Sequence, residues 1–142
     1  MARRDVTVSR VLRADARLVW RALTERELLA EWLMPNDFVL EPGRPFTLRT
    51  DPAPGFDGVV RAEVLEVDPG RRMLWSWKGG PVDTVVEFRV EPLGDELTRV
   101  TVVQRGFRGL RAVVVSAVLQ LGWWNLMRGP LPRCVARLAQ AP

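Results

Sequence analysis

The spacing of apolar residues changes period several times along the chain. Segment 6–12 alternates apolar and polar residues, which predicts a strand. Between residues 15 and 33 apolar side chains recur at steps of three and four, which predicts two short helices in succession. Asp15 is placed to cap the first helix, and the capping box at 24–27 predicts that the second begins at Thr24. Pro35 then ends the second helix.

From residue 36 onward the apolar positions alternate again. The alternating segments are separated by turns such as Pro42-Gly43 and Pro69-Gly70. Short strands at hairpin spacing predict an antiparallel meander, and we expect one sheet of about six strands. After segment 6–12, the predicted strands are 38–41, 46–50, 58–68, 72–78, 83–91 and 97–105.

Residues 109–139 predict a long helix whose apolar face is covered by the sheet. The residues at helical spacing on that face are Leu110, Val114, Ala117, Val118 and Leu121, followed by Leu131, Val135 and Leu138. The same register passes through Asn125 and Arg128, so we expect polar side chains to point inward halfway along. Pro130 and Pro132 predict a kink or a short break, since proline lacks a backbone N–H and its ring crowds the preceding turn.

The length and composition fit one domain spanning residues 1–142, and the predicted strands and helices make it an α+β domain. A hydrophobic fraction of 47% and a charged fraction of 27% are typical of a soluble globular protein. The uncharged run 112–127 is shorter than the roughly 18 residues that suggest a membrane span, so none is predicted. No apolar stretch follows the first charged residues, and a single cysteine fits a reducing compartment. We therefore expect a cytoplasmic protein.

Histidine and tyrosine are both absent, and this limits the catalytic and metal-binding groups that the chain can offer. The commonest general base and the usual transition-metal ligand are missing, and no cysteine cluster replaces them. The sequence also lacks a phosphate-binding glycine loop and a dinucleotide fingerprint. Neither a metal nor a cofactor is predicted. Cys134 lies between Arg133 and Arg137, which would lower its pKa, but without a base nearby a structural thiol is favoured.

Charge is unevenly distributed along the chain. Residues 1–96 carry 14 Lys and Arg against 17 Asp and Glu, whereas residues 97–142 carry seven Arg and no acidic residue. A basic C-terminal part is compatible with nucleic acid, an anionic lipid or an anionic ligand. A solvated helix face explains the charge as well and is favoured, because no nucleic-acid-binding motif accompanies it. We therefore predict no nucleic-acid partner.

Several stretches taken together resemble a known superfamily. They are 19–24, 28–33, 57–58, 64–69, 74–77, 84–88, 98–102, 106–107 and 122–123. In this order they resemble the START-like (SRPBCC) superfamily, in the branch of homologues of the activator of heat-shock-protein-90 ATPase. The resemblance implies a helix-grip fold, in which a curved antiparallel sheet wraps around a long C-terminal helix and two short helices follow the first strand.

The resemblance also implies an apolar cavity between sheet and helix. Relatives bind or carry lipids, hormones and polyketides there, and a few catalyse cyclisation or dehydration. The family often has a histidine near the end of the last strand, where this chain has Gln104. That departure removes an acid–base group and leaves a hydrogen-bonding role for Gln104.

The candidate ligand-binding residues are mostly aromatic. Trp side chains would stack on a flat apolar ligand, or fill the core instead, while Gln104, Asn125 and Arg128 would orient the ligand. The full predicted set is Trp32, Phe46, Trp75, Trp77, Val86, Phe88, Gln104, Val118, Trp123, Asn125 and Arg128.

Three functions remain open at this point. Binding of a small apolar or amphipathic ligand is favoured over catalysis, because no catalytic group is predicted. A cyclase or dehydratase would require an inward carboxylate with a raised pKa, from Glu63, Asp83 or Glu87. A co-chaperone-like interaction module is the third, on the family resemblance alone. Exposed strand edges allow either a monomer or a homodimer.

Overall fold

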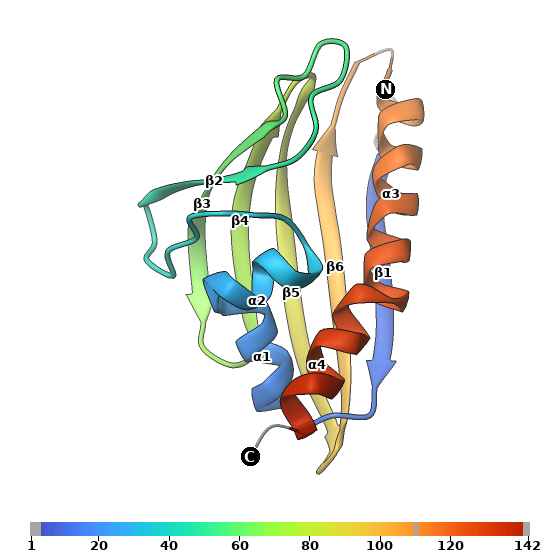
Figure 1. Cartoon of the computed structure of the whole chain (residues 1–142). Helices are drawn as coiled ribbons and strands as arrows, with labels where there is room; N and C mark the ends of the chain where they lie inside the picture. The colour runs from blue at the N-terminus through green and yellow to red at the C-terminus, as the bar shows by residue number, and fades with distance from the viewer. Residues whose placement is uncertain (1–3, 110, 141–142) are drawn as a thin grey trace.

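Six antiparallel strands form one curved sheet against which the helices lie (Figure 1). The computed structural model describes residues 4–109 and 111–140. The strand order is β1-β6-β5-β4-β3-β2, so β1 and β2 are the two edges. The strands are β1 (Arg4–Leu12), β2 (Pro45–Arg49), β3 (Val59–Asp68), β4 (Arg72–Gly79), β5 (Val82–Gly94) and β6 (Leu97–Phe107).

Two pairs of helices complete the fold. α1 (Ala16–Thr24) and α2 (Arg26–Trp32) pack together on the concave side of the sheet, and α3 (Ala112–Arg128) runs along β1. α4 (Pro130–Gln140) continues from α3 and lies against α1 and α2 (Figure 1). This is the α+β helix-grip arrangement, and the fold class predicted from the sequence is confirmed.

The starts of α1 and α2 differ in how they are capped. Asp15 accepts a hydrogen bond from the backbone N–H of Arg17 at 2.8 Å, as its position before α1 predicts. The predicted capping box of α2 is wrong. Thr24 is the last residue of α1, and its hydroxyl donates to the carbonyl of Trp20 at 2.7 Å. That bond within α1 competes with capping, so α2 begins after Glu25 without a side-chain cap.

The predicted strand 38–41 is wrong as well, since these residues form no regular strand. The side chain of Asn36 accepts from the N–H of Phe38 at 2.9 Å, and the carboxylate of Asp37 accepts from Thr47. Short polar side chains thus bind backbone groups that a strand ladder would otherwise use. Phe38 is nevertheless buried, so its apolar side chain was a correct sign of the core.

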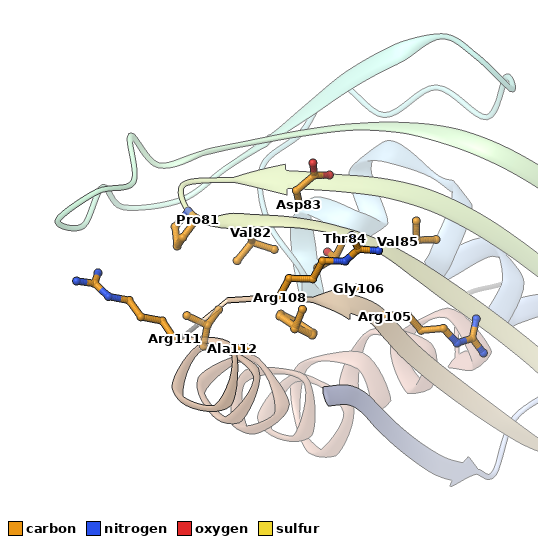
Figure 2. A pocket seen from close by; sticks show the side chains of 12 residues that line it. Pro81, Val82, Asp83, Thr84, Val85, Arg105, Gly106, Arg108, Arg111 and Ala112 are labelled. Carbon is orange, nitrogen blue, oxygen red and sulfur yellow. The ribbon is translucent and has the colours of Figure 1, made fainter. Parts of the chain in front are cut away.

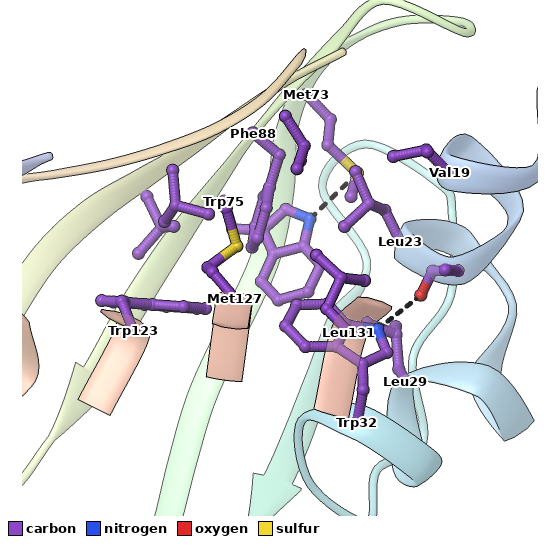
Figure 3. Close-up of a cluster of buried hydrophobic side chains, with 14 of the residues drawn as sticks. Val19, Leu23, Leu29, Trp32, Met73, Trp75, Phe88, Trp123, Met127 and Leu131 are labelled. Atoms are coloured by element: carbon purple, nitrogen blue, oxygen red, sulfur yellow. Dashed lines mark hydrogen bonds between the residues drawn. The ribbon is translucent and has the colours of Figure 1, made fainter. Parts of the chain in front are cut away.

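The core is a continuous hydrophobic cluster between the sheet and the helices, with several aromatic rings among its members (Figure 3). Trp75 lies at its centre, with its ring centroid 4.6 Å from Phe88 and 5.1 Å from Phe46. Trp32 closes the side toward α1, and its indole N–H donates to the carbonyl of Ala22 at 2.7 Å. Because the indole donor is paired, Trp32 is buried without an unsatisfied polar group.

The last helical segment breaks where the prolines predict. α3 ends at Arg128, and Pro130 is the first residue of α4, a position where no backbone N–H is needed. α4 buries the predicted face, Leu131, Val135 and Leu138, together with Cys134.

The predicted face of α3 is wrong. Its buried residues are Ala112, Ser116, Trp123 and Met127, whereas Val114, Ala117, Val118 and Leu121 are exposed. Ser116 and Val118 differ by about 200° around a helix, so α3 is turned by roughly half a revolution from the prediction. Leu110, the first residue of the predicted face, lies outside the described residues. α3 also has apolar side chains almost all round, which makes periodicity a poor guide to its orientation.

The convex face of the sheet holds one buried carboxylate, Glu87. Its neighbours Val86 and Phe88 both point into the core, so Glu87 points outward. Three guanidinium groups surround it, from Arg72 at 2.6 Å and from Arg89 and Arg105 at 3.0 Å. Hydrogen bonds, first from Arg89 and then from Arg72, outweigh the effect of burial and lower the pKa of Glu87 to about 2.

Glu87→Gln is expected to lower the free energy of unfolding by about 2 kcal/mol at pH 7, because it removes a buried, hydrogen-bonded charge. A lowered pKa stabilises the fold above the ordinary value of 4.5, and this contribution is lost as the pH falls toward 2. Urea unfolding at pH 7 and at pH 2.5 should therefore show the wild-type advantage shrinking in acid.

Glu91→Gln is the matched control, since Glu91 pairs with Arg99 on the same face but both side chains are about half exposed. Its cost should be below about 0.5 kcal/mol at either pH. Equal costs for the two variants would contradict the role given to Glu87.

Candidate functional site

An apolar groove opens between α3 and the sheet, at the end of the molecule away from α4. It has a volume of about 400 Å³. One wall is α3, the floor is the inner face of β3 and β4, and the other wall is the loop that precedes β3. The lining residues are Met34, Thr50, Ala53, Pro54, Phe56, Val60, Trp77, Gly79, Pro81, Val82, Val114, Val115, Val118 and Leu119. Among the residues that the structure describes, no charged side chain lines the groove.

Two glycines hold the loop wall in place. Gly58 has φ +82°, and a Cβ atom there would lie 2.5 Å from the carbonyl oxygen of Thr50. Only glycine fits this turn, which lets the N–H of Thr50 donate to the carbonyl of Gly58 at 2.8 Å. At Gly79, a Cβ atom would lie 3.0 Å from the ring of Phe56, so the missing side chain lets Phe56 pack against β4.

A chain of hydrogen bonds lies beneath the groove. The indole N–H of Trp123 donates to the side-chain oxygen of Gln104 at 2.9 Å. The amide of Gln104 donates to the hydroxyl of Thr84 at 2.8 Å, and that hydroxyl donates to the carbonyl of Trp77 at 3.2 Å. All three side chains are buried, and the rings of Trp77 and Trp123 are 5.6 Å apart. The network therefore fixes Trp77, which forms part of the groove floor.

Nine of the eleven predicted site residues fall into three groups in the structure. Trp77 and Val118 line the groove. Gln104 and Trp123 lie below it in the hydrogen-bonded network. The remaining apolar members fill the core: Trp32, Phe46, Trp75, Val86 and Phe88.

The expectation that Asn125 and Arg128 point inward is wrong, because both are exposed. Arg128 instead places its guanidinium 5.1 Å from the ring centroid of Trp124 on the outer side of α3. The turn of α3 that buries Trp123 and Met127 directs these two polar residues toward solvent.

Sequence reasoning missed much of the groove lining. Met34 follows α2, and Ala53 and Phe56 lie in a loop without hydrophobic periodicity. The nearest signal was the apolar run at the start of α3, where Val114 and Val118 were predicted to be covered by protein. They line the groove instead, with 66% and 64% of their surfaces exposed.

None of the three candidate catalytic carboxylates faces the groove. Glu63 lies between Ala62 and Val64, which are both buried, so Glu63 points to the convex face. Glu87 does the same, and its pKa is lowered rather than raised. Asp83 is exposed. The arrangement that the enzyme hypothesis required is therefore absent from these three residues.

Cys134 behaves as a structural thiol. It is buried on α4, and desolvation raises its pKa to about 12 despite the nearby Arg137. The sequence expectation of a lowered pKa is wrong, because burial outweighs the neighbouring positive charge. Among residues 4–109 and 111–140, no group of three or more Cys, Asp or Glu side chains is placed to hold a metal ion.

Comparison with known proteins gives the family. The family model described as "Activator of Hsp90 ATPase homolog 1-like protein" matches residues 13–136. The chain belongs to this family. The branch of the START-like superfamily that the sequence resembles is thereby confirmed. No curated protein matches the sequence. In the part of the chain that the structure describes, no helix has the length and apolarity needed to cross a membrane.

Solved structures similar to this chain cover most of its length. Protein MLL2253 from Mesorhizobium loti is 29% identical, with a TM-score of 0.83 over 94% of this chain and 98% of that one. DynU16, from the dynemicin biosynthetic locus, is 27% identical with a TM-score of 0.72, over 91% of this chain but only 46% of its own. The Aha1 dimer from Colwellia psychrerythraea is 16% identical with a TM-score of 0.67, over 87% and 90% of the two chains, and shows the fold alone.

Gln104→Leu is expected to lower the free energy of unfolding by about 2 kcal/mol, because it leaves the indole N–H of Trp123 buried without an acceptor. In a Trp123→Phe background that donor is already gone, so the same substitution should cost clearly less. Urea denaturation of the wild type, both single variants and the double variant measures the coupling. Additive costs would show that this hydrogen bond contributes little.

Proposed function

We propose that this protein binds a small apolar or amphipathic molecule in the groove between α3 and the sheet. The observation that supports this most is the composition of the groove, in which apolar side chains from α3, the sheet and a loop converge without a charged residue among those described. A volume of about 400 Å³ lies within the range of small-molecule pockets, roughly 300–1,000 Å³.

The exposed side chains of α3 supply the driving force. Val114 and Val118 are among the most exposed large apolar residues on the described surface, and both lie in the groove wall. Covering apolar surface releases about 25 cal/mol per Å², so a guest that covers both valines and Leu119 gains binding energy without any directed bond. Trp77 and Phe56 add flat surfaces that suit a ring or an alkyl chain equally.

Binding is favoured over the other two functions by the same lining. The described lining of the groove offers the Thr50 hydroxyl but no carboxylate, thiol or imidazole, so none of these side chains can act as a general acid or base there. A co-chaperone role rests on the family description, without a feature of the described surface that argues for it. Two expectations remain predictions from the sequence. They are that the protein is a monomer or a homodimer, and that it is located in the cytoplasm.

An uncharged fluorescent probe, N-phenyl-1-naphthylamine, tests the proposal. It should bind saturably to the wild type, and Val118→Gln should weaken the affinity about five- to tenfold by placing a polar amide in the groove wall. Fluorescence titration measures both affinities.

Val113→Gln is the matched control. Val113 is an exposed valine of the same helix that does not line the groove, so its substitution should change the affinity less than about twofold. Absence of saturable binding, or equal losses in both variants, would overturn the proposal.

A further inference from the structure

A second pocket adjoins the apolar groove at the ends of β5 and β6 (Figure 2). Its volume is about 440 Å³. It shares Pro81, Val82 and Val115 with the groove, so the two hollows have a common wall. The other lining residues are Asp83, Thr84, Val85, Arg105, Gly106, Phe107, Arg108, Arg111 and Ala112. We call this hollow the basic pocket.

The basic pocket exists because β6 leaves β5 before it leaves β1. The pairing of β5 with β6 begins at Val85 and Arg105, whereas Phe107 at the end of β6 still pairs with β1. Gly106, between these points, has φ +105°, which interrupts the regular strand. The first turn of α3 then closes the gap with Ala112 and Val115.

Three arginines lie at the rim of the basic pocket, and they differ in whether they form an ion pair. Arg105 is paired with Glu87 at 3.0 Å and is directed away from the centre of the pocket in Figure 2. Arg108 and Arg111 are exposed, and within residues 4–109 and 111–140 neither forms an ion pair. Figure 2 shows Arg108 extending toward Thr84 and Val85, with Arg111 at the opposite end of the pocket from Arg105.

Among the described residues that line the basic pocket, Asp83 is the acidic one, and its carboxylate points away from Arg108 in Figure 2. The chain has no acidic residue after position 96, and the first turn of α3 has none either. The N-terminal end of α3 adds partial positive charge on the same side. Two uncompensated guanidinium groups thus stand next to an apolar groove that has no charge of its own.

We propose that the basic pocket binds the anionic head group of an amphipathic ligand whose apolar part occupies the groove. The inference rests on the proposed function and adds the chemical class: an apolar chain or ring ending in a carboxylate or a phosphate. Arg108 and Arg111 supply forked N–H donors that suit either group. The shared wall at Val82 and Val115 lets one small molecule contact both hollows.

Three probes with the same ten-carbon chain separate the head group from the tail: decanoate, decyl phosphate and uncharged 1-decanol. Calorimetric titration of the wild type should show at least one of the two anions binding about tenfold more tightly than the alcohol, and the stronger anion identifies the head group. Arg108→Gln combined with Arg111→Gln should remove this preference and leave the affinity for 1-decanol unchanged. The unchanged affinity for 1-decanol also shows that the double variant is folded.

Arg133→Gln, repeated with the same probes, is the matched control, because Arg133 is an exposed arginine on α4 that lines neither hollow. It should keep the full preference for the anion. Equal binding of all three probes to the wild type, or a preference that survives the double substitution, would overturn the head-group assignment while leaving the proposed function standing. Failure of all three probes to bind would overturn both.

Discussion

The uncharged residues 112–127 need apolar cover on nearly every side, yet the sheet reaches α3 along one side only. A helix with apolar side chains all round is normally enclosed by the rest of its protein. Here Ala112, Ser116, Trp123 and Met127 are enclosed, and the side that carries Val114 and Val118 is left over. The groove, its apolar lining and the proposed binding of an apolar ligand all follow from this uncovered apolar surface on α3.

The position of the groove depends on which part of the core the large side chains fill. Trp32, Trp75, Phe46 and Phe88 fill the space between the sheet and α1, α2 and α4. The loop 50–58 is folded back on itself through Gly58 and lines the groove together with α3. Packing is therefore dense at the end near α4 and incomplete at the start of α3, where Trp77 is the last large ring of the floor.

The acidic side chains of the central strands point to the convex face of the sheet. Glu63 and Glu87 point to the convex face, where Glu87 is held by three arginines. The concave face carries mostly apolar residues, and two of its buried polar side chains, Thr84 and Gln104, are hydrogen-bonded to one another. Arg108 and Arg111, which form no ion pair within the described residues, lie just before the start of α3 and next to the apolar groove. Membership of the Activator of Hsp90 ATPase homologue family agrees with the fold. The placement of these charged and polar side chains depends on the residues of this chain.

The sequence by itself determined the order of the elements, the cap of α1 by Asp15, the break at Pro130 and the buried face of α4. In each case the signal is local: a periodic contrast of apolar and polar residues, or a residue with one steric preference. Leu131, Val135 and Leu138 stand among arginines, so the apolar side of α4 is unambiguous.

Only the tertiary structure decided which side of α3 is covered, and with it the direction of Asn125 and Arg128 and the place of the groove. Apolar residues surround α3, so its periodicity contains little information and the rotation is set by contact with β1 and β6. Segment 38–41 illustrates the same limit, because its alternation is real but Asn36 and Asp37 bind the backbone groups that a strand would need. The groove lining consists of residues from four separate parts of the chain. No local sequence pattern predicts that these residues come together.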